Sequence, residues 1–158
     1  MKSCKIDSVG CQELEQVGDV VVSAASIACD GERTLVVDDE AAILRLFRTV
    51  FKLEIPGVIV DVALNGLQAV DSFVKNHQAV LVMDINMPVM DGQAAFHEIE
   101  KLCRERNWNM PAVVFCTGYA PPDLMKEVGG SRHCVLLKPS NYMAVADAVR
   151  LRLNQAVA

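Results

Sequence analysis

The sequence predicts an α/β fold: a doubly wound parallel sheet of five strands, in the order 2-1-3-4-5, with five helices. Short apolar runs of strand length alternate with stretches of helical period, and this alternation is typical of parallel βαβ units with right-handed crossovers. The run 80–83 is apolar throughout, as expected of a parallel strand buried on both faces. It ends on one carboxylate, Asp84.

The elements follow from these runs in chain order. Strands are predicted over residues 35–37, 58–63, 79–84, 112–116 and 134–137. Helices are predicted from 66 to about 75 and from 92 to about 104. An earlier helix follows the acidic residues 38–40, and its apolar residues recur at i, i+4, i+7 and i+8, which places on one face Ile43, Phe47, Val50 and Phe51.

The last two predicted helices differ in length. Pro121-Pro122 and Gly129-Gly130 confine the fourth helix to a short segment, because proline is tolerated only in the first turn of a helix. Ser140 is the predicted N-cap of the fifth helix. The predicted inner face of that helix consists of Tyr142, Val145, Ala146, Val149 and Leu153.

Composition limits the class of protein. A chain of 158 residues, 52% of them apolar, fits one domain with a sizeable core. Its net charge of −5 gives no excess of positive charge that would attract nucleic acid or an anionic membrane surface. No run is long enough to span a bilayer, and no secretory signal follows Met1. We expect a cytoplasmic protein without nucleic-acid or membrane partners, in which the six cysteines are buried or surface thiols.

Residues 1–33 form an N-terminal extension, and the domain pattern covers residues 34–158. The extension is open to three interpretations: an extra strand, a surface helix or a flexible leader. Residues 31–33 are predicted as a loop. The valine-rich run 20–22 could support a homodimer by strand addition or exchange. Sedimentation of a chain that starts near residue 31 would test this.

Polar side chains end the predicted strands. Asp38 and Asp39 follow the first, Asp84 ends the third, Thr117 follows the fourth and Lys138 follows the fifth. The carboxyl ends of parallel strands share one edge of the sheet, and ligands bind in the crevice there. We therefore expect these five side chains to converge. Each alone is explained as a turn residue, but their occurrence at successive buried strands favours a site.

The chemistry of three close carboxylates predicts a metal. Such groups repel one another unless a cation balances them, and an oxygen-only ligand set with room for water favours Mg²⁺. Asp38, Asp39 and Asp84 are the predicted ligands, together with the backbone carbonyl of Asn86. Asp84 could then attack a phosphoryl group and form an aspartyl-phosphate. Lys138 would balance the remaining negative charge, and the Thr117 hydroxyl could hydrogen-bond the transferred group.

The sequence resembles the receiver domain of two-component response regulators, a family that includes the chemotaxis regulator. The resemblance covers 34 to about 155. It rests on Val36-Val37-Asp38-Asp39-Glu40, Ala63-Leu64-Asn65-Gly66-Leu67-Gln68-Ala69, Met83-Asp84-Ile85-Asn86-Met87-Pro88-Val89-Met90-Asp91-Gly92, Thr117-Gly118 and Lys138-Pro139.

The resemblance implies a flavodoxin-like fold and Mg²⁺-dependent phosphorylation of Asp84. The donor would be the phosphohistidine of a sensor histidine kinase or histidine phosphotransfer protein, or a small molecule such as acetyl phosphate. It implies a cis peptide bond at Lys138-Pro139, and it assigns Asn86 and Tyr119 to positions that tune phosphoryl lifetime. We expect Tyr119 to shield the acyl phosphate partly from water.

Besides Tyr119, the sequence departs from the family pattern at two further places. An aromatic residue that responds to the threonine normally stands three positions before the lysine, and here that position holds Val135. The fourth helix, where the output surface of the family normally lies, is short and begins with proline. Both departures bear on how phosphorylation would be read out.

Because the chain ends near its last helix, the sequence predicts a stand-alone receiver that docks to an unidentified downstream protein or relays its phosphoryl group. It would catalyse only its own phosphorylation and dephosphorylation. One alternative is a receiver fold that binds partners without phosphorylation. Another is a phosphatase with an aspartyl-phosphate intermediate, but the general acid that such enzymes need two residues after the nucleophile is replaced by Asn86.

Overall fold

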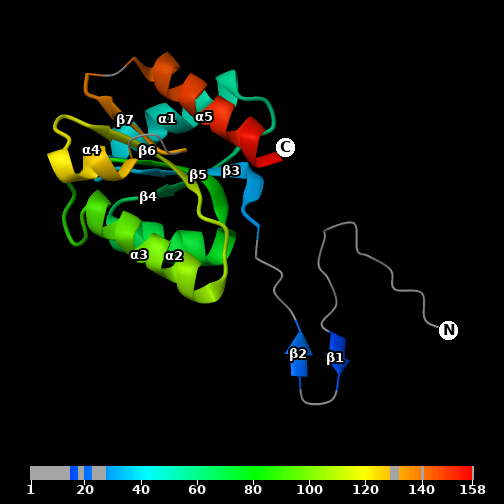
Figure 1. Cartoon of the computed structure of the whole chain (residues 1–158). Coiled ribbons are helices and arrows are strands. Elements are labelled where there is room, and N and C mark those ends of the chain that lie inside the picture. The colour runs from blue at the N-terminus through cyan, green and yellow to red at the C-terminus, as the bar shows by residue number, and fades with distance from the viewer. Residues whose placement is uncertain (1–14, 18–19, 23–27, 129–131, 140, 158) are drawn as a thin grey trace.

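The computed structural model describes residues 15–17, 20–22, 28–128, 132–139 and 141–157. Within them, five parallel strands form one sheet in the order β4-β3-β5-β6-β7 (Figure 1). This is the predicted order 2-1-3-4-5, counted from the first strand of the domain, and it confirms the fold class. The strands are β3 (Asp30–Val37), β4 (Ile59–Ala63), β5 (Gln78–Met83), β6 (Ala112–Thr117) and β7 (Cys134–Leu137).

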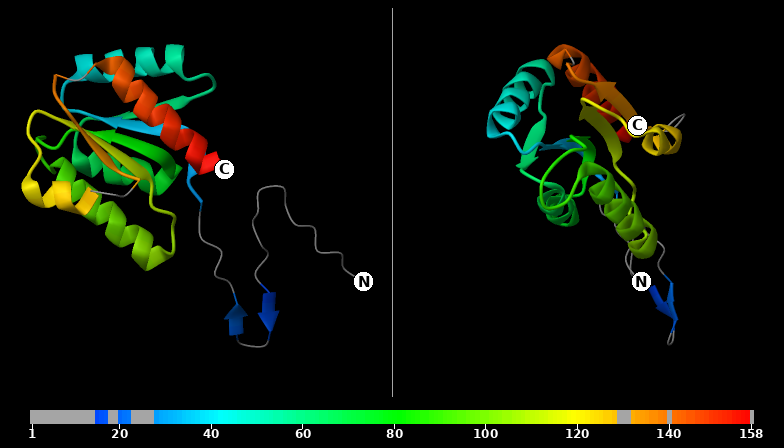
Figure 2. Two further views of the ribbon diagram at one scale, coloured as in Figure 1. Left: turned by 45° about the horizontal axis from the view of Figure 1, so that its top comes forward. Right: turned by 90° about the vertical axis from the view of Figure 1, so that its left-hand side faces the viewer.

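Helices cover both faces of the sheet, as Figure 2 shows from two sides. One face carries α1 (Ala41–Glu54) and α5 (Tyr142–Val157), and the other carries α2 (Gly66–Asn76) and α3 (Gly92–Arg106). The short α4 (Pro122–Val128) packs its two buried residues, Leu124 and Val128, into the core on the α2 and α3 side. Its length of seven residues confirms the predicted short fourth helix.

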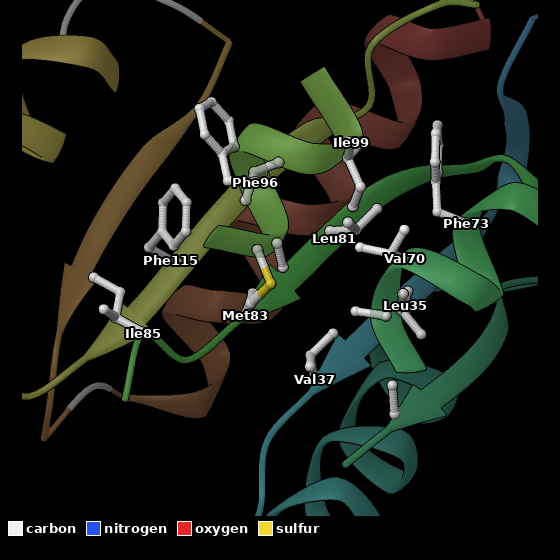
Figure 3. Close-up of a cluster of buried hydrophobic side chains, with 14 of the residues drawn as sticks. Leu35, Val37, Val70, Phe73, Leu81, Met83, Ile85, Phe96, Ile99 and Phe115 are labelled. Carbon is white, nitrogen blue, oxygen red and sulfur yellow. The ribbon is translucent and has the colours of Figure 1, made fainter. Parts of the chain in front are cut away.

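The core consists of two apolar layers separated by the sheet. Figure 3 shows the layer beneath α2 and α3, where Leu35, Leu81 and Phe115 of the strands meet Phe73 and Ile99 of the helices. Alternate strand residues point to the other layer, beneath α1 and α5. Every residue of β5 and β6 is buried, which is the burial expected of central parallel strands.

Side-chain caps fix the first turns of α2 and α3, two of the helices that begin at the polar edge of the sheet. The Asn65 side chain accepts a hydrogen bond from the Gln68 N–H, and the Asp91 side chain accepts one from the Ala94 N–H. Each cap satisfies a backbone donor that has no partner within its helix. Gly92, directly after Asp91, lies so close to the Asp84 backbone that a Cβ atom there would stand 2.1 Å from the Asp84 carbonyl oxygen.

Several local expectations are wrong. Residues 31–33 belong to β3 and not to a loop, because the Asp30 N–H donates to the His77 carbonyl and Arg33 pairs with Ile59. In α1 the buried face is rotated: Leu44 is buried, whereas Ile43 and Val50 are only partly buried.

At the start of α5, Tyr142 is 39% exposed and is therefore not buried as predicted, although its ring packs edge-on against Phe47 of α1. The predicted N-cap Ser140 lies outside the described residues. The side chain of Asn141 accepts a hydrogen bond from the Met143 N–H. The other four predicted residues of the inner face, Val145, Ala146, Val149 and Leu153, are buried.

Part of the N-terminal extension is described. Strands β1 (Glu15–Val17) and β2 (Val20–Val22) form a separate antiparallel sheet, which agrees with the strand interpretation for these residues. Most of residues 1–27 lie outside the described residues, so the division at residue 33 and the homodimer stay predictions. Among the described residues, no helix is long and apolar enough to cross a bilayer.

Candidate functional site

The predicted site residues stand where four neighbouring strands end. Backbone hydrogen bonds continue the ladder past the strands: the Asp84 N–H donates to the Val37 carbonyl over 3.1 Å, and the Lys138 N–H donates to the Thr117 carbonyl over 2.7 Å. The strand ends are therefore level with one another. Asp38, Asp84, Thr117 and Lys138 emerge at one edge of the sheet, as the crevice argument predicted.

The three aspartates form a tight anionic cluster. One carboxylate oxygen from each of Asp38, Asp39 and Asp84 lies within 4.8 Å of the others. The side chains of Asp38 and Asp84 are only 5% and 13% exposed, whereas Asp39 is exposed. Burial and the neighbouring charge of Asp84 raise the pKa of Asp38, although the Glu40 N–H and Lys138 act against them. Like charges held this close favour capture of a cation.

Lys138 is the cation that the chain itself supplies to this cluster. Its Nζ lies 3.0 Å from an oxygen of Asp84 and 3.4 Å from an oxygen of Asp38. Burial lowers the pKa of Lys138, but the hydrogen bond to Asp84 and the charges of both carboxylates outweigh it and raise the pKa above its usual value. Lys138 is therefore protonated near neutral pH, and one ammonium faces three carboxylates.

Thr117 and Tyr119 meet in the loop that follows β6. Thr117 is fully buried, and its Oγ1 donates to the Tyr119 carbonyl over 3.1 Å and accepts from the Tyr119 N–H over 3.4 Å. The Tyr119 residue is 64% exposed. In β7, Val135 is partly buried against the core layer beneath α2 and α3. The hydroxyl thus binds the loop backbone, and an aliphatic side chain fills the position of the family's aromatic residue.

The loop between β5 and α3 is held close to the cluster. The exposed Asn86 donates its N–H to Asp84 Oδ1 over 3.3 Å, and the Gly66 N–H at the start of α2 donates to the Met90 carbonyl over 2.9 Å. Val89 is 76% exposed and has φ of +71°, a left-handed conformation that β-branched residues rarely adopt. Sequence reasoning missed this backbone conformation, because a valine gives no local signal for a positive φ.

Next to Lys138 lies a cavity that the sequence did not reveal. It measures about 440 Å³ and is lined by Glu40, Ile43, Phe47, Cys116, Lys138, Pro139 and Tyr142. The peptide bond between Lys138 and Pro139 on its wall is cis, as the family resemblance implied. Lys138 lines this cavity and also pairs with Asp84 of the acid cluster.

The comparisons with known proteins identify the family. The profile of the response regulator receiver domain matches residues 34–150. The chain belongs to the receiver family of two-component signalling. It is 34% identical to sporulation initiation phosphotransferase F of Bacillus subtilis over 122 residues, which cover 75% of this chain and 91% of that protein.

Other relatives match over a part of their length. A protein-glutamate methylesterase/protein-glutamine glutaminase of Methanococcoides burtonii is 42% identical over 69 residues, 44% of this chain and 20% of that protein. The matched region therefore spans about a fifth of that relative. Among solved structures, the receiver domain of a Francisella response regulator superposes with a TM-score of 0.64 at 25% identity, covering 78% of this chain and 98% of that one.

Proposed function

We propose that this receiver domain accepts a phosphoryl group on Asp84 in a Mg²⁺-dependent reaction, and that phosphorylation changes its binding to a partner protein. The observation that carries the proposal is the imbalance of charge at the strand ends, where Asp38, Asp39 and Asp84 share the single ammonium of Lys138. The position of Asp84 at the end of the central strand favours it as the nucleophile.

The donor set fits Mg²⁺. All three side chains offer carboxylate oxygens within 4.8 Å of one another, and the exposed Asp39 leaves the cluster open to water. Hard divalent cations prefer such oxygen ligands. Asp38, Asp39, Asp84 and the carbonyl of Asn86 would hold the ion. When bound, it would offset negative charge on the phosphoryl oxygens and on the donor.

Three side chains of the site would each have a separate role in the transfer of the phosphoryl group. An oxygen of Asp84 attacks phosphorus as the bond to the donor breaks; for a phosphohistidine donor, the leaving imidazole takes up a proton. Lys138, already 3.0 Å from Asp84, offsets charge on the transferred group. The hydroxyl of Thr117 would exchange its contact with the Tyr119 carbonyl for one with the phosphoryl group.

That exchange would couple the site to a surface. Phosphorylation adds roughly −1.5 to −2 charges at neutral pH, and release of the Thr117 hydroxyl frees the loop before α4 to rearrange. We propose a sensor histidine kinase or histidine phosphotransfer protein as donor, because sporulation initiation phosphotransferase F bears a phosphotransferase name and shares most of its length with this chain. The downstream partner would bind to the surface formed by this loop and the neighbouring helices.

A Phos-tag gel with acetyl phosphate and Mg²⁺ tests the proposal. The chain should show a shifted band that disappears without Mg²⁺ and in the variant Asp84→Asn. The matched variant Asp91→Asn removes the exposed N-cap acid of α3 and should keep the shift. A shift that survives Asp84→Asn would contradict the assignment of the phosphoacceptor.

Val135 gives a specific reason to test the alternative, a receiver fold that binds partners without phosphorylation. An aliphatic residue at this position cannot move as the family's aromatic residue does. The alternative predicts that a partner captured by the wild-type chain binds Asp84→Asn equally well. The proposed function predicts that beryllofluoride, a phosphoryl mimic, changes the binding of the wild type and leaves Asp84→Asn unaffected.

A further inference from the structure

Two thiols from distant parts of the chain meet at the amino end of the sheet. Cys29 lies directly before β3, and Cys103 lies in the last turn of α3. Cys29 Sγ donates to the backbone carbonyl oxygen of Asn109 over 3.3 Å, and Cys103 Sγ donates to the same oxygen over 3.6 Å. Because both sulfur atoms contact one oxygen, their separation cannot exceed the sum of these two short contacts.

We propose that Cys29 and Cys103 are a redox-sensitive pair that forms a reversible disulfide with a low-molecular-weight disulfide, such as oxidised glutathione, as the oxidant. Intracellular disulfides are commonly transient and redox-sensing. The bond would tie the segment that enters β3 to the end of α3, at the opposite end of the sheet from Asp84. Nothing in the proposed phosphorylation uses either thiol.

The difference in exposure between the two thiols determines which of them reacts first. Cys29 is partly exposed, whereas Cys103 is only 5% exposed, so Cys29 reacts first with a reagent from solution. The Cys29 thiolate attacks one sulfur of oxidised glutathione and expels one glutathione thiolate, which leaves a mixed disulfide. The Cys103 thiolate then attacks the sulfur of Cys29 and expels the second glutathione. Two protein thiols lose two electrons and two protons, and one glutathione disulfide becomes two thiols.

The surroundings tune this reactivity. Burial raises the pKa of both thiols to about 11, and the nearby positive charge of Arg132 offsets part of the effect at Cys29. Few molecules carry a thiolate at neutral pH, so exchange at Cys29 is slower than at an exposed cysteine. Arg132 is itself exposed, and its guanidinium would attract an anionic reagent such as oxidised glutathione to Cys29.

A tryptophan next to the two thiols can report on formation of the disulfide. Trp108, the only tryptophan of the chain, donates its backbone N–H to the Cys103 carbonyl over 2.9 Å. Its neighbour Asn109 supplies the oxygen that both thiols share. Bond formation between Cys29 and Cys103 should therefore change the fluorescence of Trp108. It should also raise the thermal midpoint, because a cross-link between distant residues restricts the unfolded chain.

The full chain, incubated with oxidised or reduced glutathione, tests the proposal. Oxidation should remove two of the six thiols, and peptide mapping should recover a Cys29–Cys103 cross-link that dithiothreitol reverses. Cys103→Ser should instead keep glutathione attached to Cys29. The matched variants Cys116→Ser and Cys134→Ser should form the cross-link at the wild-type rate, and circular dichroism checks that all variants fold.

Three results with the wild-type chain would overturn the proposal: no loss of thiols, a stable mixed disulfide at Cys29, or a bond from Cys29 to Cys4 or Cys11. The role of the nearby charge has its own test. Arg132→Gln should slow oxidation by glutathione disulfide but not by the neutral hydroxyethyl disulfide. Equal slowing with both reagents would contradict electrostatic attraction.

Discussion

At the amino end of the sheet, two carboxylates share one guanidinium that has a donor for each of them; at the carboxyl end, three carboxylates share one ammonium. Arg33 Nη1 lies 3.1 Å from both oxygens of Asp61, and its Nε lies 3.1 Å from Asp30. The buried Gln78 amide adds a donor to Asp61 over 2.9 Å. Such a network stabilises the junction of β3, β4 and β5, and each of its two carboxylates has a donor on Arg33.

At the carboxyl end, by contrast, three carboxylates face the single ammonium of Lys138. Two of those carboxylates are nearly buried, so solvent screens their repulsion only weakly. Both ends bring acidic and basic side chains together. The difference teaches that the size of the charge imbalance, and not the presence of charged residues, distinguishes a candidate site from a structural network.

Removal of the cation should give the largest difference between the two ends of the sheet, because it should affect phosphorylation at one end and stability at the other. Lys138→Met should slow phosphorylation by acetyl phosphate about a hundredfold, because the charge on the transferring group loses its partner. Arg33→Met should leave that rate unchanged and lower stability instead. Rates from Phos-tag gels and unfolding curves in urea measure both. Equal loss of phosphorylation in the two variants would break the comparison.

Neutralising one acid at each end should change stability in opposite directions. In metal-free buffer, Asp38→Asn should raise the free energy of unfolding by about 1 kcal/mol, because it relieves repulsion in a buried cluster whose charged form is already disfavoured. Asp61→Asn should lower it by about 2 kcal/mol, because Arg33 loses its bidentate partner. Urea unfolding in the presence of EDTA measures both changes in the free energy of unfolding. Changes of the same sign in the two variants would contradict the comparison.

His133, next to the amino half of β6, should give a smaller, pH-dependent effect. Its Nδ1 accepts the Val113 N–H over 3.0 Å, and burial, with the charges of Arg132 and Arg152, lowers its pKa to about 4. The unfolded chain binds the proton near pH 6.5, so this contribution is complete above that pH and is lost as the pH falls toward 4. His133→Gln should flatten the pH dependence of the free energy of unfolding over this range by about 1 kcal/mol.

The smallest expected effect concerns phosphoryl lifetime at the carboxyl end. If Tyr119 shields the acyl phosphate, Tyr119→Ala should speed loss of the phosphoryl group about two- to threefold by admitting water. Tyr119→Phe should keep the wild-type rate, since the ring and not the hydroxyl would exclude water. Decay of the Phos-tag band after removal of the donor measures it. An unchanged rate in Tyr119→Ala would remove Tyr119 from the lifetime-tuning positions.

The sequence predicted the carboxyl end better than the amino end, for a physical reason. Asp38, Asp84 and Lys138 each follow an apolar run, so strand direction alone brings them to one edge. Arg33 and Asp61 lie within strands, and only the register between β3 and β4 reveals that they meet. The same holds for the start of β3, which depends on the distant carbonyl of His77.

Helix faces and loops show the same limit. The periodic pattern of α1 does not decide between Ile43 and Leu44 as the buried residue, because neighbouring positions differ by a small rotation about the helix axis. The left-handed Val89 lies next to Met90, whose carbonyl accepts a hydrogen bond from Gly66 in a distant part of the chain. The shared contact of Cys29 and Cys103 joins segments that no local pattern connects.

A thermal-shift titration with Mg²⁺ tests the central claim of unbalanced charge most directly. A bound ion stabilises the folded chain in proportion to the logarithm of its concentration once the site is saturated. We predict that Mg²⁺ raises the melting temperature of the wild type and of Asp61→Asn, and that the rise is lost in the double variant Asp38→Asn, Asp39→Asn. An equal rise in all three proteins would contradict the account.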